Sequence, residues 1–520
     1  MKKENETQAQ STSNASNQAA ASNDAAVAEI LDKAPATLNR PLCIMGERAY
    51  LATWLSFKMA DATSNEVLAL LRDDGRLYTD APVDYAIPLA EIEMDIKLPT
   101  VPAQDCIISG HGVKRYLQSG AANPAEILYR IRRLVDQFMD FSRSIGSQED
   151  MVDLFSLFCI VTYCLDAFPS VPYLWTNGGK GSGKTQGIQL VTDISYLGTL
   201  LLSGGTYASL RDMADYGACL GFDDAETVAK SGRLNADKRA LMLAGNRKGA
   251  YITVKERGEG GNWRTRYVNT FCPKLYSAIN RPDDVLASRT ITVPLVRSSD
   301  PSKANADPLD RACWCVDRRT LIDDLWLLGL TSMSEIQDYC RKVPERIGLS
   351  GRDLEPWRAL LAVALWYQEK QGVKGIFDRL SGLATNYQQE RQEIEHPSPE
   401  HVAIMGLRKL MPRMKSSIRF SPTNLADTMN DIIQDDECGA QDMNHVSPNQ
   451  AGMILSRLRI KRAPRTSRGK LWRIGQAELN ELERAYGIEH VDDQHGEADA
   501  GSDNVFVHEK RFPPQLTAVN

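Results

Sequence analysis

The sequence lacks several features that would narrow its function at once. Its longest apolar run, Leu154–Leu165, is too short to span a bilayer and is bracketed by Asp153 and Asp166. Residues 1–23 are polar and contain no apolar core of a secretory signal. No C-x-x-C pair occurs among the ten cysteines, so the pattern does not indicate a zinc site. We therefore expect a cytoplasmic protein with reduced cysteines and no membrane segment.

An excess of positive charge is also missing. The 61 lysines and arginines are outnumbered by 67 aspartates and glutamates, which gives a formal net charge of -6. Any contact with nucleic acid must therefore come from local basic patches. An apolar content of 42% over 520 residues is ordinary for a globular protein and suffices for several domains.

The most informative stretch that is present is Pro172–Thr185, PYLWTNGGKGSGKT. It fits G-x-x-x-x-G-K-[ST], the P-loop pattern, after an apolar strand (Pro172–Trp175) and before a helical run (Gln186–Thr192). We expect Lys184 to reach the outer phosphates of ATP and the Thr185 hydroxyl to hold Mg²⁺. The predicted nucleotide-binding residues are Gly178, Gly179, Lys180, Gly181, Ser182, Gly183, Lys184 and Thr185.

Apolar segments separated by helical patterns predict a doubly wound α/β domain with a parallel sheet. The five candidate strands are Pro172–Trp175, Thr199–Leu202, Ala218–Phe222, Lys274–Ile279 and Ile291–Val296.

Polar residues follow several of these strands, at the edge where ligands gather in such sheets. Asp223 is predicted to bind Mg²⁺ with Thr185, and Asp224 to orient or deprotonate the attacking water, with Glu226 in reserve. Asn280 is expected to contact the γ-phosphate or that water. Arg289 is a candidate arginine finger for a neighbouring subunit.

Two alternating runs, Tyr251–Arg257 and Trp263–Val268, surround a glycine-rich turn and predict a β-hairpin. We expect Lys255 and Arg257 on the first arm, with Arg264 and Arg266 on the second, to form one basic set of alternate positions. The set is either a DNA-gripping surface or a solvated face.

The C-terminal part, 400–488, is predicted to fold as three helices followed by a hairpin, an order typical of a winged helix. No acidic residue interrupts the basic residues between Arg457 and Arg473. They predict DNA contacts, although a winged helix used only for protein contact stays open. Arg457 is expected on the recognition helix, and Arg465, Arg468 and Lys470 on the wing.

The order of these motifs resembles that of superfamily III helicases, which are AAA+ ATPases of viruses, phages and plasmids. The motifs are the P-loop, the Asp-Asp strand end, the basic hairpin, the P-x-L-x-S-x-x-N strand from Pro273 to Asn280, and Ser288-Arg289. The resemblance covers about residues 173–297 and extends to ATPases of bacterial mobile elements. It implies a ring, usually a hexamer, with ATP at subunit interfaces and the hairpin in the pore. Lys184, Thr185, Asp223, Asp224 and Asn280 would then act in cis, and Arg289, or else Arg281, in trans.

The expected function is an ATP-hydrolysing DNA motor or replication initiator of a mobile element, with a primase or another replication protein as a partner. The alternative is a regulatory ATPase switch that controls assembly with a partner, for example in phage defence. The expected organisation is a disordered leader (1–38), a small N-terminal α/β module (39–120), a P-loop core (121–300), a helical lid (301–396), a winged helix (400–488) and a disordered tail (489–520).

Overall fold

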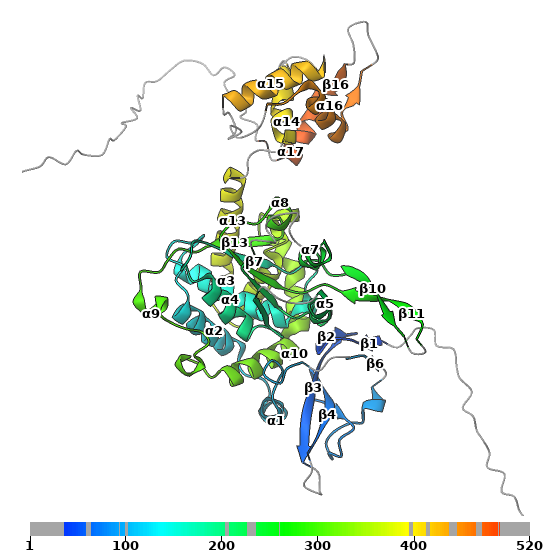
Figure 1. Ribbon diagram of the computed structural model, residues 1–520, viewed down its shortest axis with the longest axis vertical. Coiled ribbons are helices and arrows are strands. Elements are labelled where there is room, and N and C mark those ends of the chain that lie inside the picture. Colours follow the sequence, from blue (N-terminus) through cyan, green and yellow to red (C-terminus); the bar gives the residue numbers. More distant parts are fainter. Residues whose placement is uncertain are drawn as a thin grey trace, which may run out of the picture. The chain divides into compact units, whose positions relative to one another are not determined.

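A computed structural model describes most of the chain and divides it into two compact units, Met1–Tyr387 and Gln388–Asn520. Figure 1 shows their helices and strands. The described residues are 36–58, 64–92, 94–98, 102–202, 207–225, 236–258, 261–394, 399–411, 416–435, 445–463, 471–486 and 488. The predicted tail, most of the predicted leader, Glu226, Arg465, Arg468 and Lys470 lie outside these residues.

The centre of the first unit is a five-stranded sheet in the order β13-β7-β12-β9-β8, with every neighbouring pair parallel. The predicted parallel sheet in an α/β fold is thereby confirmed. β12 lies between β7 and β9, so the strand before the glycine-rich loop is not adjacent to the strand that ends in Asp223. The strands are β7 (Tyr173–Asn177), β8 (Thr199–Leu202), β9 (Leu220–Asp223), β12 (Lys274–Ala278) and β13 (Thr290–Pro294).

Helices pack around this sheet. Most of the longest apolar run, Leu154–Leu165, lies in α3 (Gln148–Tyr163). This helix is buried along nearly its whole length and begins at a capping box of Ser147 and Asp150. Burial raises the pKa of the Cys159 thiol on this helix to about 12. The other helices near the sheet are α2 (Pro124–Phe138), α4 (Lys184–Ile194), α5 (Tyr207–Asp215), α7 (Ala236–Leu243) and α8 (Asp284–Ala287).

The N-terminal module is a four-stranded antiparallel sheet in the order β2-β3-β4-β5, together with a parallel pair, β1 and β6. Leu51 and Leu71 point into the main core, whereas the alternate Tyr50 and Leu70 belong to a small separate core. Three residues of the predicted leader form β1. The elements are β1 (Ala36–Leu38), β2 (Leu42–Met45), β3 (Arg48–Lys58), β4 (Ser64–Arg72), β5 (Leu77–Thr79), β6 (Met94–Ile96) and α1 (Gly110–Ser119).

The segment predicted as a helical lid shares its core with both the sheet domain and the N-terminal module. Its longest helix, α10 (Arg318–Lys342), packs against α12, α3 and β3. One apolar cluster therefore runs from Leu42 to Tyr387. Tyr387 also accepts a hydrogen bond from Thr292 N (2.9 Å) on strand β13, at the edge of the sheet. The other helices here are α9 (Pro301–Ala304), α11 (Gly351–Leu354), α12 (Arg358–Glu369) and α13 (Ile376–Ile394).

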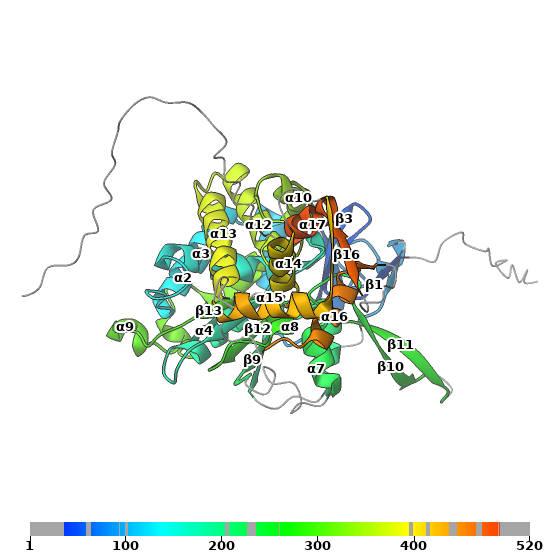
Figure 2. The same ribbon diagram turned by 90° about the horizontal axis from the view of Figure 1, so that it is seen from above.

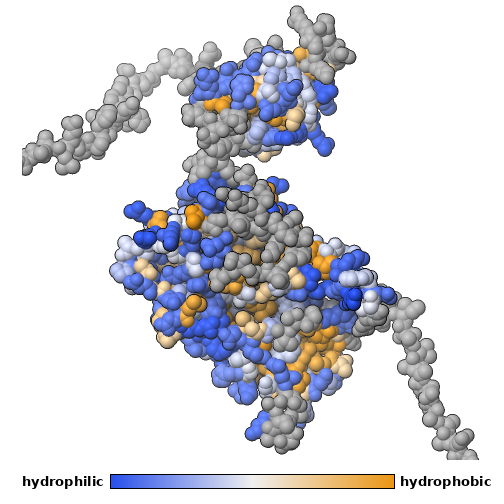
Figure 3. Space-filling view, in the orientation of Figure 1, coloured by the Kyte–Doolittle hydropathy of each residue, from blue (hydrophilic) through white to orange (hydrophobic). Residues whose placement is uncertain are grey.

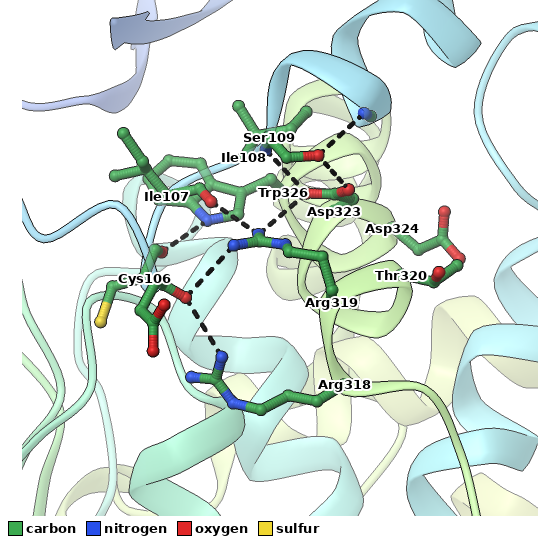
Figure 4. Close-up of polar contacts among 12 residues, drawn as sticks. Cys106, Ile107, Ile108, Ser109, Arg318, Arg319, Thr320, Asp323, Asp324 and Trp326 are labelled. Atoms are coloured by element: carbon green, nitrogen blue, oxygen red, sulfur yellow. Dashed lines mark hydrogen bonds and ion pairs between the residues drawn. The ribbon is translucent and has the colours of Figure 1, made fainter.

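A polar clasp fastens the segment before α1 to the start of α10 (Figure 4). Asp323 accepts hydrogen bonds from Ser109 N (2.8 Å), Ser109 Oγ (2.6 Å) and Arg319 (2.8 Å). Arg319 also donates to Ile107 O (2.6 Å), and Trp326 donates to Cys106 O (2.9 Å). The clasp satisfies a buried carboxylate and fixes the N-terminal module to the helices.

The second unit has its own apolar core and a three-stranded antiparallel sheet in the order β14-β16-β15. The three predicted helices and the hairpin are present, and β14 and α17 are additional elements. The elements are α14 (Pro399–Leu410), β14 (Ser417–Phe420), α15 (Pro422–Gln434), α16 (Pro448–Arg457), β15 (Lys461–Arg462), β16 (Trp472–Gly475) and α17 (Gln476–Ala485).

Within the described part of the chain, none of the helices has the length and apolar content needed to cross a bilayer.

Candidate functional site

The glycine-rich loop, Gly178–Gly183, joins the end of β7 to the start of α4. Gly181 (φ 78°) and Gly183 (φ 84°) adopt the left-handed conformation that glycine allows. A Cβ at Gly178 would overlap the carbonyl oxygen of Leu295 and lie 2.7 Å from Ser182 Oγ. The loop backbone is therefore packed tightly against the end of β13, and only glycine fits at Gly178.

The polar groups of this loop face one another. The Lys184 ammonium donates to Gly178 O (2.7 Å) and Gly179 O (2.9 Å). Ser182 Oγ and Asn177 Oδ1 are buried and have no hydrogen-bond partner among the described residues. Since buried polar atoms are normally paired, these two atoms mark a place where a polar ligand can supply contacts.

Three side chains meet where β9 and β12 end. Thr185 Oγ1 lies 3.1 and 3.3 Å from the two carboxylate oxygens of Asp223, to which it donates. Ser277 on β12 also donates to this carboxylate. A hydroxyl beside a carboxylate is an oxygen ligand set of the kind that Mg²⁺ prefers. The predicted pair of Thr185 and Asp223 thus lies together.

Asp224 has an unusual backbone conformation. Its φ of 52° lies in the left-handed region, and its side chain is exposed. Aspartate tolerates this conformation better than most residues, but it still carries strain, and such strain concentrates at functional sites.

Asn280 and Arg281 follow the carboxyl end of β12, whereas Arg289 immediately precedes β13 and so lies at the opposite, amino-terminal edge of the sheet. Ala278 is paired with Asn177 of β7, and Asn280 is exposed two residues further on, at the same edge of the sheet as the loop. Arg289 is half-buried, and its guanidinium donates to Leu243 O (2.6 Å) at the end of α7. Arg281 is exposed.

Other residues contact the loop region and received no role from the sequence. Arg297, just beyond β13, donates to Lys180 O (3.3 Å). Gln186 at the start of α4 donates to Lys303 O (3.1 Å) and Ala306 O (2.8 Å). Among Arg297, Gln186 and Ser277, Ser277 alone belonged to a recognised sequence motif, as the serine of the P-x-L-x-S-x-x-N strand.

The predicted hairpin consists of β10 (Tyr251–Arg257) and β11 (Trp263–Asn269), which pair antiparallel. Figures 1 and 2 both show it projecting away from the sheet. Lys255 is opposite Thr265, and Arg257 is opposite Trp263. Directly opposed residues share a face, so Arg264 and Arg266 belong to the other face. The prediction of one basic set on one face was wrong, because the strand register places the basic residues of the first arm opposite uncharged residues of the second arm.

The two faces also differ in charge. Arg264 donates to Glu256 (2.9 Å), and Arg266 pairs with Asp215 on α5. These arginines are neutralised within the chain. On the opposite face, the Arg257 guanidinium lies 5.6 Å from the centre of the Trp263 ring.

The basic C-terminal segment is described only in part. Arg457, at the end of α16, is exposed and forms an ion pair with Glu400 (3.2 Å). The Arg462 guanidinium lies 5.3 Å from the centre of the Trp472 ring. A pocket of about 470 Å³ is bounded by α16 and β16, and its lining includes Met453, Arg457, Arg462 and Trp472.

Comparisons with known proteins add little to this geometry. No protein-family model matches the sequence, and no curated protein matches it. Among solved structures, the chain is similar to the A-form apo structure of the NrS-1 C-terminal region. Sequence identity is 10%, with 81% of this chain and 96% of that chain covered, at a TM-score of 0.28. A similarity at this TM-score supports no functional argument.

Proposed function

We propose that the chain binds and hydrolyses ATP at the glycine-rich loop. The observation that supports this most directly is the proximity of the Thr185 hydroxyl to the Asp223 carboxylate (3.1 Å) beside the loop that Lys184 bridges. A lysine, a hydroxyl and a carboxylate at the carboxyl ends of parallel strands form a site for a nucleotide and its metal ion. We therefore interpret Gly178–Thr185 as a P-loop.

Each of these residues has a task in the proposed reaction. Lys184 would exchange its two carbonyl partners for phosphate oxygens, and the N-terminus of α4 would add its positive dipole. Thr185 and Asp223 would hold Mg²⁺, which neutralises phosphate charge when it is bound. Asp224 would take the proton of the attacking water, and Asn280 would orient that water.

We further propose that this ATPase is a ring-forming DNA motor of the replication type, with a hexamer as the expected assembly. The hairpin would contact a DNA strand, and the second unit would act as a winged helix that contacts duplex DNA. For the trans position, exposed Arg281 is better suited than Arg289, which already donates to Leu243 O within its own subunit. A primase or another replication protein remains the proposed partner.

The test is steady-state ATP hydrolysis without nucleic acid, with single-stranded DNA and with duplex DNA. The wild type is compared with Lys184→Ala and with Lys114→Ala, which removes an exposed lysine from α1. We expect Lys184→Ala to abolish hydrolysis and Lys114→Ala to retain it. Stimulation by DNA that weakens with salt supports the motor. A rate that ignores DNA supports the regulatory switch, and hydrolysis that survives Lys184→Ala contradicts the ATP site.

A further inference from the structure

One face of the hairpin carries aromatic rings and positive charge together. Tyr251, Trp263 and Tyr267 are 59%, 63% and 69% exposed, which is high for large rings. The register places them on the same face as Lys255 and Arg257. We call this surface the aromatic face, and its residues are Tyr251, Thr253, Lys255, Arg257, Trp263, Thr265, Tyr267 and Asn269. None of them is acidic.

The aromatic face is not needed to hold the hairpin in place. The opposite face carries fully buried Val268 and the Arg266–Asp215 ion pair, and Asn269 N donates to Asp215 Oδ1 (2.9 Å). α5, which contributes Asp215, therefore contacts the hairpin from that other side. In Figure 3 the projecting hairpin is mostly blue and white, whereas orange patches gather over the N-terminal module. The rings are thus presented to solvent on a polar arm.

The spacing of the rings suits an extended polymer. Trp263 and Tyr267 are four residues apart on β11, which corresponds to about 13 Å along a strand. That length equals roughly four nucleotides of a fully stacked strand and fewer of an extended one, so the two rings can contact different bases of the same strand. Tyr251 is opposite Asn269, so it lies on the diagonal from Tyr267, at a distance that large side chains can bridge. Lys255 and Arg257 lie beside this row on the neighbouring strand β10, opposite Thr265 and Trp263.

We propose that the aromatic face binds single-stranded nucleic acid by stacking nucleobases on Tyr251, Trp263 and Tyr267. Lys255 and Arg257 neutralise the phosphates of the same strand. Exposed rings combined with cations bind single strands with little sequence preference, since every base has a face that stacks. Duplex DNA keeps its bases paired and offers no such face. This inference refines the DNA contact in the proposed function, and it does not require ATP hydrolysis.

The experiment is a fluorescence anisotropy titration of the full-length chain without nucleotide. The probes are a labelled oligo-dT, an abasic oligomer of the same length, an oligo-rU and a duplex. We expect tight binding to oligo-dT and weaker binding to the abasic oligomer, which has the same phosphates but no bases. Each of Tyr251→Ala, Trp263→Ala and Tyr267→Ala should weaken binding to oligo-dT about tenfold. Comparable binding of oligo-rU would extend the site to RNA.

Matched variants separate stacking from general damage. Tyr267→Phe should keep its affinity for oligo-dT because the ring remains. Tyr85→Ala removes an equally exposed ring from the N-terminal module and should leave this affinity unchanged. Arg257→Ala should weaken binding, whereas Arg264→Ala removes the same charge from the other face and should not.

Three results would overturn the proposal. The first is equal affinity for the abasic and the normal oligomer, and the second is unchanged affinity of the alanine variants for oligo-dT. The third is an altered oligomeric state of the alanine variants with their DNA affinity intact, which would make the aromatic face a subunit contact. Because binding is measured without ATP, the result can be interpreted even if the chain proves not to hydrolyse ATP.

Discussion

Substitution of Gly178 by alanine tests how the glycine-rich loop is built. A Cβ at Gly178 overlaps the backbone carbonyl of Leu295, which cannot rotate away as a side chain can. Leu295 N also donates to Asn177 O (2.7 Å), so relief of the overlap must separate the ends of β7 and β13. Overpacking of this kind costs about 1–3 kcal/mol. We expect Gly178→Ala to lower the melting temperature by several degrees and to abolish nucleotide binding.

Gly179→Ala is the matched control in the same loop. A Cβ at Gly179 meets no atom within 4 Å, and its φ is not positive. The free energy of unfolding of this variant should therefore stay within about 0.5 kcal/mol of the wild-type value, and its melting temperature should be essentially unchanged. Thermal unfolding and binding of a fluorescent ATP analogue give both readouts. Equal stability of the two variants would refute the close packing of the loop against β13.

Two further predictions concern side chains near the loop. Asp224→Ala and Asp224→Gly should both lower ATP hydrolysis at least about 100-fold. Because φ is 52°, the glycine variant should have a free energy of unfolding about 1 kcal/mol higher than the alanine variant in denaturant titrations, and the opposite order would refute the strain. Arg289→Ala should lower stability by about 1 kcal/mol because Leu243 O loses its donor, whereas Arg281→Ala should leave the melting temperature unchanged. Mixing Arg281→Ala with Lys184→Ala subunits should restore part of the ATP hydrolysis, and no recovery at any ratio would argue against a site shared between subunits.

Much of the central sheet could be predicted from the sequence. Its strands are short apolar runs, and the fully buried Tyr173 and Leu220 lie in two of them. Such runs are typical of parallel strands covered on both faces. The proximity of Thr185 and Asp223 also followed from local order, since Asp223 ends β9, Thr185 follows the loop after β7, and the two parallel strands end at the same edge of the sheet. These inferences need only the order of residues along the chain and the rule that parallel strands end at the same edge of their sheet.

Contacts between distant segments could not be predicted in this way. The face on which Arg264 and Arg266 lie depends on the register of two strands, and a shift of one residue moves every side chain to the other face. The ion pair of Arg266 with Asp215 and the hydrogen bond of Arg289 to Leu243 O each join segments with no common pattern. Residues 301–396 were predicted to form a helical lid, yet their helix α10 packs against β3 and completes the core of the N-terminal module.

This shared core affects how the chain can fold during synthesis. The inner face of the N-terminal sheet is covered by α10, whose first residue follows the end of β4 by about 250 residues. At about 5–20 residues per second, a ribosome needs on the order of tens of seconds to deliver that helix. During this interval the face that carries Leu51 and Leu71 lacks its cover from α10, and the nascent sheet exposes apolar surface. Chaperone protection of the first hundred residues would then matter more than their small size suggests.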